Sequence, residues 1–455
     1  MSATTRVPVR PPVRTFGGTD LIAPVTLGII GAGAMAVIAL WWHDTFVVHG
    51  LDGWLTNAGR ITGLLAGYAI VVLLALMARL PVLERGLGTD RLARWHAAGG
   101  RYTVCLAVAH TLLIIWGYSL TTRTGLVSQT TRLLTGYPDV LMATVALAIL
   151  VGVGIASARM ARRRLSYETW HFVHLYTYLA VALAFSHQFA TGADFIHNQP
   201  ARLYWAGLYI GVAALLIWYR VVTPLLAASR HRLHVAEVHR ENSNVVSVYV
   251  TGRDLAGLRA EPGQFFRWRF LTRELWWAAN PYSLSAAPKP NMLRITVKIA
   301  GEHSAALLHL KPGTPVFAEG PSGSFTAARR TRRKVLLLAG GVGITPLRAL
   351  FESLPGGPGD ITLIYRVNNA SDLVLRDELD EIAHARGAQV HYLVGPPRKG
   401  PQDHLSQQRL MRLIPDLRER DVFLCGPEPM MVAAKRSLRH AGLPSRRIHL
   451  ESFSF

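Results

Sequence analysis

Six apolar stretches fill the first half of the chain and constrain its architecture more than any other feature. They cover residues 22–42, 60–80, 98–118, 138–157, 170–190 and 203–225. Each approaches the roughly 20 residues that an α-helix needs to cross the hydrocarbon core of a bilayer. After Arg230 the apolar runs are short, rich in β-branched residues and interrupted by glycine and proline. The sequence therefore predicts a six-helix membrane domain over residues 1–228, followed by a soluble half.

The composition agrees with a membrane part and excludes a disordered chain. Of the 455 residues, 50% are hydrophobic and 17% are charged, against about 25% charged residues in soluble proteins. The formal net charge of +21 could indicate nucleic-acid binding, but no basic and aromatic motif accompanies it. Arginine-rich cytoplasmic loops explain the charge better. The two cysteines, Cys105 and Cys425, cannot build a disulfide framework or a four-cysteine metal site.

The arginines between the apolar stretches predict the orientation. Eleven lie on one side, at positions 6, 10, 14, 79, 85, 91, 94, 159, 162, 163 and 164. Four lie on the other side, namely Arg60, Arg123, Arg132 and Arg202. Because positive residues accumulate on cytoplasmic loops, we expect a multi-pass protein of the cell membrane with both termini in the cytoplasm. The first stretch is too long for a signal-peptide core and is interpreted as an uncleaved anchor.

Four histidines lie at matched depths on the third and fifth stretches. His96 and His110 are 14 residues apart, a helical rise of about 21 Å, and His174 and His187 are 13 apart, a rise of about 19–20 Å. Polar groups at membrane depth are usually functional. Two levels with two imidazoles each predict two stacked haems, an inner one on His96 and His174 and an outer one on His110 and His187. His171 in place of His174 gives a poorer match in depth.

The sequence leaves two points about these histidines open. A proton pathway, or histidines satisfied by neighbouring helices, is the alternative to haem. In addition, 13 residues rotate a side chain by about 140° on an ideal helix, so the fifth helix must bend, bulge or present its imidazoles from different edges. Arg101 lies one turn beyond His96. It is predicted to bind the carboxylates of the inner haem, with snorkelling to the lipid headgroups as the alternative.

The soluble half changes character near residue 329. Residues 229–328 contain short strands separated by turns, which predicts an antiparallel β-barrel. In residues 329–455 strands alternate with helices, which predicts an α/β parallel sheet. A glycine-rich loop at residues 339–346 follows the first of these strands. Such a loop lets backbone approach a pyrophosphate at a helix N-terminus, but the ordinary Rossmann fingerprint is absent.

Four motifs of the soluble half resemble those of the ferredoxin–NADP reductase superfamily. They are a flavin motif, a flavin-phosphate motif, a nicotinamide-nucleotide loop and a Cys-Gly-Pro motif, at Asn280-Pro281-Tyr282-Ser283-Leu284-Ser285, Gly301-Glu302-His303-Ser304, Gly340 to Pro346 and Cys425-Gly426-Pro427-Glu428-Pro429-Met430. Joined to six helices with paired histidines, the whole chain resembles the ferric reductase and NADPH oxidase family, in its bacterial form.

This resemblance implies FAD, NADPH or NADH, and two b-type haems as cofactors. Tyr282 would lie along the flavin ring and Ser283 near its reactive nitrogen, while Thr345 and Cys425 would flank the nicotinamide. The C-terminal Phe455 would stack on the flavin where the nicotinamide must arrive. The other residues implied in cofactor binding are Asn280, Pro281, Val297, Lys298, Gly301, His303, Ser304, Gly340, Gly341, Val342, Gly343, Ile344, Pro346, Gly426, Pro427 and Glu428.

Some positions depart from the family pattern or refine it. Asn280 stands where the family usually has arginine or histidine, so we expect a loosely held flavin. Arg60 matches the arginine that frames the oxygen site of NADPH oxidases, but Ile114 replaces the histidine expected beside it. Arg366 follows the second α/β strand without an acidic neighbour, so it can pair with a 2′-phosphate, which favours NADPH.

The predicted function is electron transfer from cytoplasmic NAD(P)H through FAD and two haems to an acceptor outside. The acceptor would be dioxygen, giving superoxide, or a ferric complex, because the outer connections, at 45–58, 119–137 and 191–202, look too short for a lid. One alternative is a membrane subunit that donates electrons to a partner protein or quinone. Another is a non-redox transporter that uses the histidines for protons, against which the nucleotide motifs argue.

Overall fold

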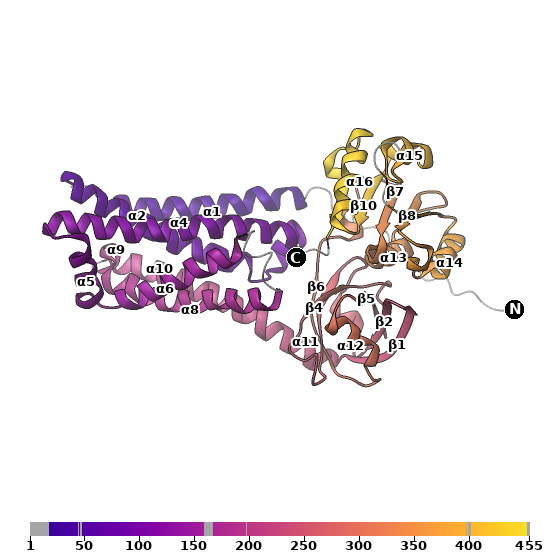
Figure 1. The fold of residues 1–455 in the computed structure, drawn as a ribbon, viewed down its shortest axis with the longest axis horizontal. Helices are drawn as coiled ribbons and strands as arrows, with labels where there is room; N and C mark the ends of the chain where they lie inside the picture. The colour runs from indigo at the N-terminus through magenta and orange to yellow at the C-terminus, as the bar shows by residue number, and fades with distance from the viewer. Residues whose placement is uncertain are drawn as a thin grey trace. The chain divides into compact units, whose positions relative to one another are not determined.

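The computed structural model describes residues 18–43, 45, 48–158, 167–196, 198–396, 398 and 402–452. They form two compact units that divide at Val222, a helical unit and a unit that contains all the strands (Figure 1). Each unit is described by itself.

The first unit consists of helices. They are α1 (Gly18–His43), α2 (Gly50–Leu76), α3 (Pro81–Leu87), α4 (Thr89–Thr122), α5 (Leu126–Gly136), α6 (Val140–Ser157), α8 (Tyr167–Thr191), α9 (Ala193–Ile196), α10 (Gln199–Ile217) and the π-helical turn η1 (Trp218–Val222). Two of the connections expected to be short loops contain helices, α5 and α9, and α2 begins ten residues before the predicted stretch at residue 60.

Five helical segments of the described chain are long and apolar enough to cross a membrane. They lie at Leu21–His43, Gly50–Leu76, Arg91–Thr122, Val140–Ser157 and Gln199–His231. The fifth predicted span, residues 170–190, is not among these segments and forms helix α8, which has 25 residues. Three histidines and Gln188 lower its mean hydropathy, so the predicted count of six spans is not confirmed by length and apolarity.

A row of glycines on α2 lets two other helices approach its backbone closely. The row consists of residues one turn apart, Gly59, Gly63 and Gly67. A Cβ built on them would lie 2.9 Å from Ile114 Cδ1, 2.5 Å from His110 Nδ1 and 2.9 Å from Trp205 Cζ2, respectively. No side chain fits at these positions, so α4 and α10 pack directly on α2. Small residues at four-residue spacing serve this purpose in membrane helices.

Buried polar side chains join helices inside this unit. Trp205 donates its indole N–H to Gln188 Oε1 at 2.7 Å, and Tyr209 donates its hydroxyl to the carbonyl of Gly67 at 3.2 Å. Tyr68 donates to the carbonyl of Ile30 at 2.9 Å. Each bond satisfies a polar group that lipid cannot satisfy, and together they connect α1, α2, α8 and α10.

The second unit begins with helix α11 (Thr223–His231) and two antiparallel sheets. One has the order β1-β2-β5, with β1 at His234–Asn242, β2 at Val245–Thr251 and β5 at Leu293–Lys298. The other has the order β4-β3-β6, with β4 at Asn280–Ser283, β3 at Phe265–Phe270 and β6 at Val316–Ser322. Helix α12 (Glu302–Ala306) follows β5 and precedes β6 in the chain.

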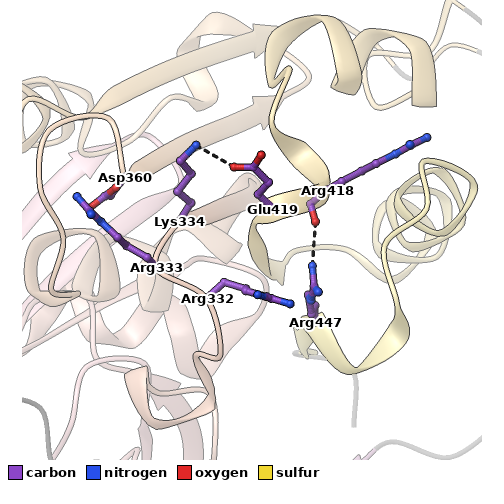
Figure 2. Close-up of a pocket in the computed structure, with 7 residues that line it drawn as sticks. All are labelled: Arg332, Arg333, Lys334, Asp360, Arg418, Glu419 and Arg447. Carbon is purple, nitrogen blue, oxygen red and sulfur yellow. Dashed lines mark hydrogen bonds and ion pairs between the residues drawn. The ribbon is translucent and has the colours of Figure 1, made fainter.

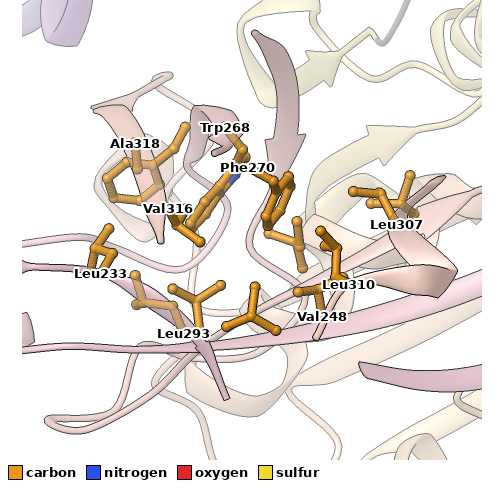
Figure 3. Close-up of a cluster of buried hydrophobic side chains, with 14 of the residues drawn as sticks. Leu233, Val248, Trp268, Phe270, Leu293, Leu307, Leu310, Val316 and Ala318 are labelled. Carbon is orange, nitrogen blue, oxygen red and sulfur yellow. The ribbon is translucent and has the colours of Figure 1, made fainter. Parts of the chain in front are cut away.

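The closed barrel predicted for residues 229–328 is not confirmed. The two sheets enclose one apolar core, part of which Figure 3 shows, including Trp268, Phe270 and Leu293. Between the sheets the pairing is limited to isolated bridges, His234 to Pro315 and Leu284 to Ile295, with a few backbone hydrogen bonds beside them. A barrel needs a continuous ladder around its circumference, so the arrangement is two sheets packed on a shared core.

The end of the chain forms the predicted parallel sheet. Its order is β11-β10-β7-β8-β9, with β7 at Val335–Gly340, β8 at Ile361–Val367, β9 at Gln389–Val394, β10 at Asp421–Cys425 and β11 at Ile448–Glu451. One apolar core contains residues of α13 (Ile344–Ser353) and α14 (Arg376–Arg386). A second core contains residues of α15 (Gln407–Leu413) and α16 (Glu428–His440). The α/β prediction for this part is thus confirmed.

An ion pair between a buried arginine and a half-buried glutamate connects the two parts of this unit. Arg294 on β5 donates to both carboxylate oxygens of Glu378 on α14, at 2.7 and 2.9 Å, and also to the backbone carbonyl of Ser285 at 2.9 Å. Arg348 on α13 reaches the same carboxylate at 2.9 Å. Burial alone would raise the pKa of Glu378, but Arg294 and Arg348 outweigh it and hold the pKa below its ordinary value.

We predict that Glu378→Gln destabilises the protein by about 2 kcal/mol, because it leaves the buried Arg294 guanidinium without its charged partner. The measurement is thermal unfolding of the full chain at neutral pH. Glu381→Gln, an exposed position on the same helix, is the control and should leave the melting temperature unchanged.

The same ion pair predicts a pH dependence. The lowered pKa of Glu378 means that its contribution is complete above its unfolded pKa of about 4.3 and is lost as the pH falls through the folded value. The difference between wild type and Glu378→Gln should therefore shrink below about pH 4. A constant difference down to pH 3 would show that the Glu378 charge contributes nothing.

Candidate functional site

The four predicted histidines meet in two pairs inside the helical unit. The ring centroids of His96 on α4 and His174 on α8 are 5.9 Å apart, and those of His110 and His187 are 6.3 Å apart. Helix α8 runs from Tyr167 to Thr191 without a break in its assignment, so both of its imidazoles reach α4 although 13 residues separate them.

Hydrogen bonds orient three of the rings. His96 Nδ1 donates to the carbonyl of Leu73 at 3.2 Å, and His110 Nδ1 donates to the carbonyl of Gly59 at 2.8 Å. His187 Nδ1 donates to the carbonyl of Ala184 at 2.8 Å. Since a carbonyl only accepts, the proton in each ring lies on Nδ1, and Nε2 keeps its lone pair for a metal ion.

The fourth ring is held differently. His174 Nδ1 is buried and has no hydrogen-bond partner among the described residues. The ring stacks on Trp170, with centroids 5.1 Å apart and planes at 25°. Ring stacking thus takes the place of the carbonyl that orients the other three imidazoles.

The geometry of both pairs fits a metal between two imidazoles. Two ring nitrogens on opposite faces of one ion, each about 2.0 Å from it, place the ring centroids about 6.3 Å apart. No group of three histidine, cysteine, aspartate or glutamate side chains that could hold a metal occurs in the described part of the chain. Each level therefore offers two imidazoles, which would suit a metal ion whose remaining ligands came from a porphyrin.

Two arginines lie on the helices around the inner pair. Arg101 is exposed on α4 and has no hydrogen bond or ion pair within the described ranges. Arg220 in η1 donates to the carbonyl of Met77 at 2.8 Å and interacts electrostatically with His96. The sequence analysis missed Arg220, although a charged residue within the apolar stretch 203–225 was a usable signal. Short π-helical segments such as η1 frequently occur at functional sites.

The predicted oxygen-site arginine has an acidic neighbour. Arg60 Nε lies 3.7 Å from Asp194 Oδ2, and Arg60 Nη1 donates to Asn57 Oδ1 at 3.3 Å. The side chain of Asp194 on α9 is only 4% exposed. Ile114 packs on Gly59, beside Arg60 in the chain. The sequence analysis did not single out Asp194, because it lies in a connection that looked like an open loop.

The flavin motif lies on β4 and pairs with β3. Ser283 is opposite Phe265 and is buried, while the backbone carbonyl of Tyr282 accepts the indole N–H of Trp268 at 3.0 Å. Asn280 and Pro281 begin the same strand, where both are half-buried. Burial raises the pKa of Tyr282 to about 12, so its phenol stays neutral at physiological pH.

The flavin-phosphate motif caps α12. Ser304 Oγ accepts from the backbone N–H groups of Ala300 and Gly301, at 2.8 and 3.1 Å. The backbone N–H of Gly301 is therefore already bonded. The first backbone N–H groups that hydrogen bonds within the helix leave available to a phosphate are those of Glu302 and His303. The ring of His303 meets Trp277 edge-on, with centroids 4.7 Å apart. Val297 and Lys298, which end the preceding strand β5, are buried and exposed, respectively.

The nucleotide loop and the Cys-Gly-Pro motif lie against one another at the carboxyl ends of β7 and β10. A Cβ on Gly343 would overlap the carbonyl of Cys425, and a Cβ on Gly426 would lie 3.0 Å from the Cα of Gly340. Gly341 has a φ of +52°, in the left-handed region that favours glycine. This edge of a parallel sheet, at the N-terminus of α13, is where such folds bind nucleotide phosphates.

Several predicted nucleotide contacts are buried in this structure. Thr345 is 2% exposed and donates its hydroxyl to the carbonyl of Val342 at 3.0 Å. Cys425 is fully buried, and burial raises its pKa well above the ordinary value, so the thiol stays protonated. The buried predicted residues also include Gly340, Gly343, Ile344, Pro346 and Gly426, while Gly341 and Val342 are half-buried and Pro427 and Glu428 exposed.

Arg366 lies at the end of β8, opposite Gly340 in the register with β7. Its Nη2 donates to the carbonyl of Gly395, after β9, at 3.1 Å. Phe455 lies outside the described residues.

A separate charged pocket of about 630 Å³ lies at the opposite edge of this sheet. It is lined by Arg332, Arg333, Lys334, Asp360, Arg418, Glu419 and Arg447. Figure 2 shows Lys334 bonded to Glu419, at 3.0 Å, and Arg447 bonded to the carbonyl of Arg418, at 2.8 Å. Lys334 directly precedes β7, so this pocket is remote from the nucleotide loop that follows the same strand.

Comparisons with known proteins divide the chain in the same way. Residues 62–185 match the family "Ferric reductase like transmembrane component", and residues 337–436 match "Oxidoreductase NAD-binding domain". The first match contains His96, His110 and His174 and ends two residues before His187. The second match contains the glycine loop and the Cys-Gly-Pro motif.

Curated relatives match about half of this chain. The ferredoxin reductase component of 3-ketosteroid-9-alpha-monooxygenase from Mycolicibacterium smegmatis is 34% identical over 49% of this chain, which covers 65% of that relative. The glycine betaine monooxygenase reductase subunit from Pseudomonas aeruginosa is 30% identical over 51% of this chain, which covers 67% of it.

Among solved structures, the ferredoxin reductase in carbazole 1,9a-dioxygenase shares 24% identity over 49% of this chain and 69% of its own, with a TM-score of 0.42. The two family matches, joined in one chain, carry the assignment. The chain therefore joins a domain of the ferric reductase transmembrane family, at residues 62–185, to an oxidoreductase NAD-binding domain, at residues 337–436.

Proposed function

We propose that this transmembrane oxidoreductase moves electrons from NAD(P)H, through FAD and two b-type haems, to an acceptor on the other side of the membrane. The observation that carries the proposal is the pair of facing imidazoles at each of two levels, with centroids 5.9 and 6.3 Å apart. The NAD-binding domain of the same chain would bind the nucleotide that donates the electrons.

The cofactors supply the redox chemistry, since a flavin takes a hydride and passes on single electrons, and haem iron carries one electron at a time. The chain provides orientation and electrostatics. Carbonyls of α2 and α8 fix His96, His110 and His187 with Nε2 available as a ligand. The neutral phenol of Tyr282 offers an apolar wall for the flavin ring. The glycine loop at the start of α13 offers backbone N–H groups to a pyrophosphate.

The proposed direction of transfer is outward. The arginine distribution favours a cytoplasmic location for both termini and the nucleotide domain. On that orientation the His96 and His174 level receives electrons first. The outer acceptor is dioxygen, giving superoxide, or a ferric complex. Both can be reduced at an exposed haem edge.

The matched relatives favour a second candidate function. They are named as reductase components or subunits of monooxygenases, proteins that work with a partner. The chain would then donate electrons to a partner protein or quinone. Purified protein that reduces oxygen or a ferric chelate without any partner would argue against this second candidate.

The test of the proposed function is a b-type haem spectrum that becomes reduced when NADPH or NADH is added to purified, FAD-replete protein. Oxygen and a ferric chelate are then supplied separately, with superoxide followed by a dismutase-sensitive probe and ferrous iron trapped without oxygen. Protein that contains no haem, or haem that neither nucleotide reduces, would contradict the proposal.

The histidine pairs make a first prediction. His110→Ala or His187→Ala should lose mainly the outer haem, and His96→Ala or His174→Ala the inner one, since each removes one axial ligand. Haem is extracted and counted per protein. Two haems retained in all four variants would refute the ligand assignment, and a loss in His171→Ala but not in His174→Ala would replace His174 by His171.

The glycine row makes a second prediction. In Gly63→Ala the new methyl group meets His110 Nδ1, so the outer haem should be lost or its spectrum altered while the inner haem persists. Gly211→Ala on α10 is the matched control, because a Cβ there has nothing within 4 Å. Identical haem spectra in the two variants would show that the packing of His110 on α2 is unimportant.

Arg366 makes a third prediction. If it pairs with the 2′-phosphate, Arg366→Ala should raise the KM for NADPH about tenfold, as expected for loss of a charge-assisted hydrogen bond, and leave the KM for NADH nearly unchanged. Arg439→Ala, in the last turn of α16, is the control. Equal changes in the KM for both nucleotides would indicate that Arg366 only stabilises the edge of the sheet, through its hydrogen bond to Gly395.

A further inference from the structure

The ion pair of Arg60 and Asp194 is the starting point. Arg60 Nε lies 3.7 Å from Asp194 Oδ2, and the side chains of Arg60 and Asp194 are 22% and 4% exposed, respectively. Arg60 also bonds Asn57, which in turn donates to the carbonyl of Gly53 and accepts through its own carbonyl from Trp41. The arginine is therefore held in place on α2 by neighbours on both sides.

The pair lies at the level of the outer histidines. Arg60 follows Gly59, whose carbonyl accepts from His110 Nδ1. On the other side, His187 is near the end of α8, where its carbonyl accepts from Thr191 at 2.8 Å. Asp194 follows on α9, directly after that helix end. The two charges thus come from the segments that adjoin the two outer imidazoles.

Charge balance at this level has a direct consequence for an electron acceptor. An unopposed guanidinium in a poorly polarisable environment favours anions and electron transfer that creates an anion. A carboxylate beside it cancels most of that field at a distance. We propose that Asp194 balances Arg60 and thereby sets the charge preference of the outer acceptor site. This inference rests on the proposed outward electron transfer.

Other charged groups nearby do not change the assignment. Asp139, before α6, interacts electrostatically with His187. Asp52, two turns before Arg60 on α2, accepts from Thr121 at 3.0 Å. Among the described residues, Arg60 forms its ion pair with Asp194 and not with either of these aspartates. Asp52 therefore offers a control of equal charge on the same helix as Arg60.

The experiment compares acceptors of opposite charge. Wild type, Asp194→Asn and Asp52→Asn are each reduced by nucleotide and supplied with ferricyanide, an anion, or hexaammineruthenium(III), a cation. In Asp194→Asn the ratio of the anion rate to the cation rate should rise roughly tenfold, and superoxide formation should rise with it. Asp52→Asn should change this ratio by less than twofold.

A second variant separates charge balance from misfolding. Asp194→Asn combined with Arg60→Gln removes both charges, so the ratio should return toward the wild-type value. A ratio that remains as high in the double variant as in Asp194→Asn would overturn the inference, and so would an unchanged ratio in Asp194→Asn.

A redox titration with a chemical reductant gives a readout that does not depend on turnover. Asp194→Asn should raise the reduction potential of the outer haem and leave the inner one unchanged, because removal of a negative charge favours the added electron. If both haems titrate but the outer potential is unaffected, the inference on Asp194 fails while the proposed function stands. If no haem is present, the proposed function itself has failed.

Discussion

The close approach of α4 to α2 is the constraint on which the membrane unit depends. Gly63 leaves room for the ring of His110, and the carbonyl of Gly59, one turn away, accepts its Nδ1 proton. Packing and hydrogen bonding therefore act on the same side chain, so the orientation of the outer imidazole follows from the absence of side chains on α2. Gly67 continues the row and receives Trp205 of α10, which extends the packing toward the other side of the bundle.

In the unit that contains the strands, an ion pair joins neighbouring elements, whereas in the helical unit glycines allow the helices to pack closely. Arg294 holds the last residue of the flavin motif, Ser285, and reaches α14 through Glu378. The flavin motif and the nucleotide sheet are thus connected by one guanidinium. Such bidentate pairs restrict geometry as well as adding free energy. Under the proposed function, this restriction suits two sites that exchange a hydride.

The spacing of the histidines was enough to predict which rings pair, because depth in a helix depends only on residue number. The rotation of about 140° between His174 and His187 looked like an obstacle, but α8 needs no break, since one ring is bonded to its own helix and the other stacks on Trp170. The glycine row was visible in the sequence, yet its function depends on which helices it meets. Asp194 and Arg220 contact residues that are far away in the sequence, Arg60 and Met77, respectively. Local sequence patterns therefore do not identify them. The closed barrel was not confirmed, because strand composition does not determine whether a sheet closes.

The orientation of the imidazoles has an electrical consequence. The ring protons of His96, His110 and His187 are bonded to backbone carbonyls, which cannot take up a proton, so these rings carry no proton along with an electron. Under the proposed function, each outward electron is therefore an uncompensated charge. With the cytoplasm negative, every 100 mV of potential favours this transfer by about 2.3 kcal/mol per electron. Sustained turnover would collapse that potential, and a cell that uses this protein must return positive charge outward by a separate route.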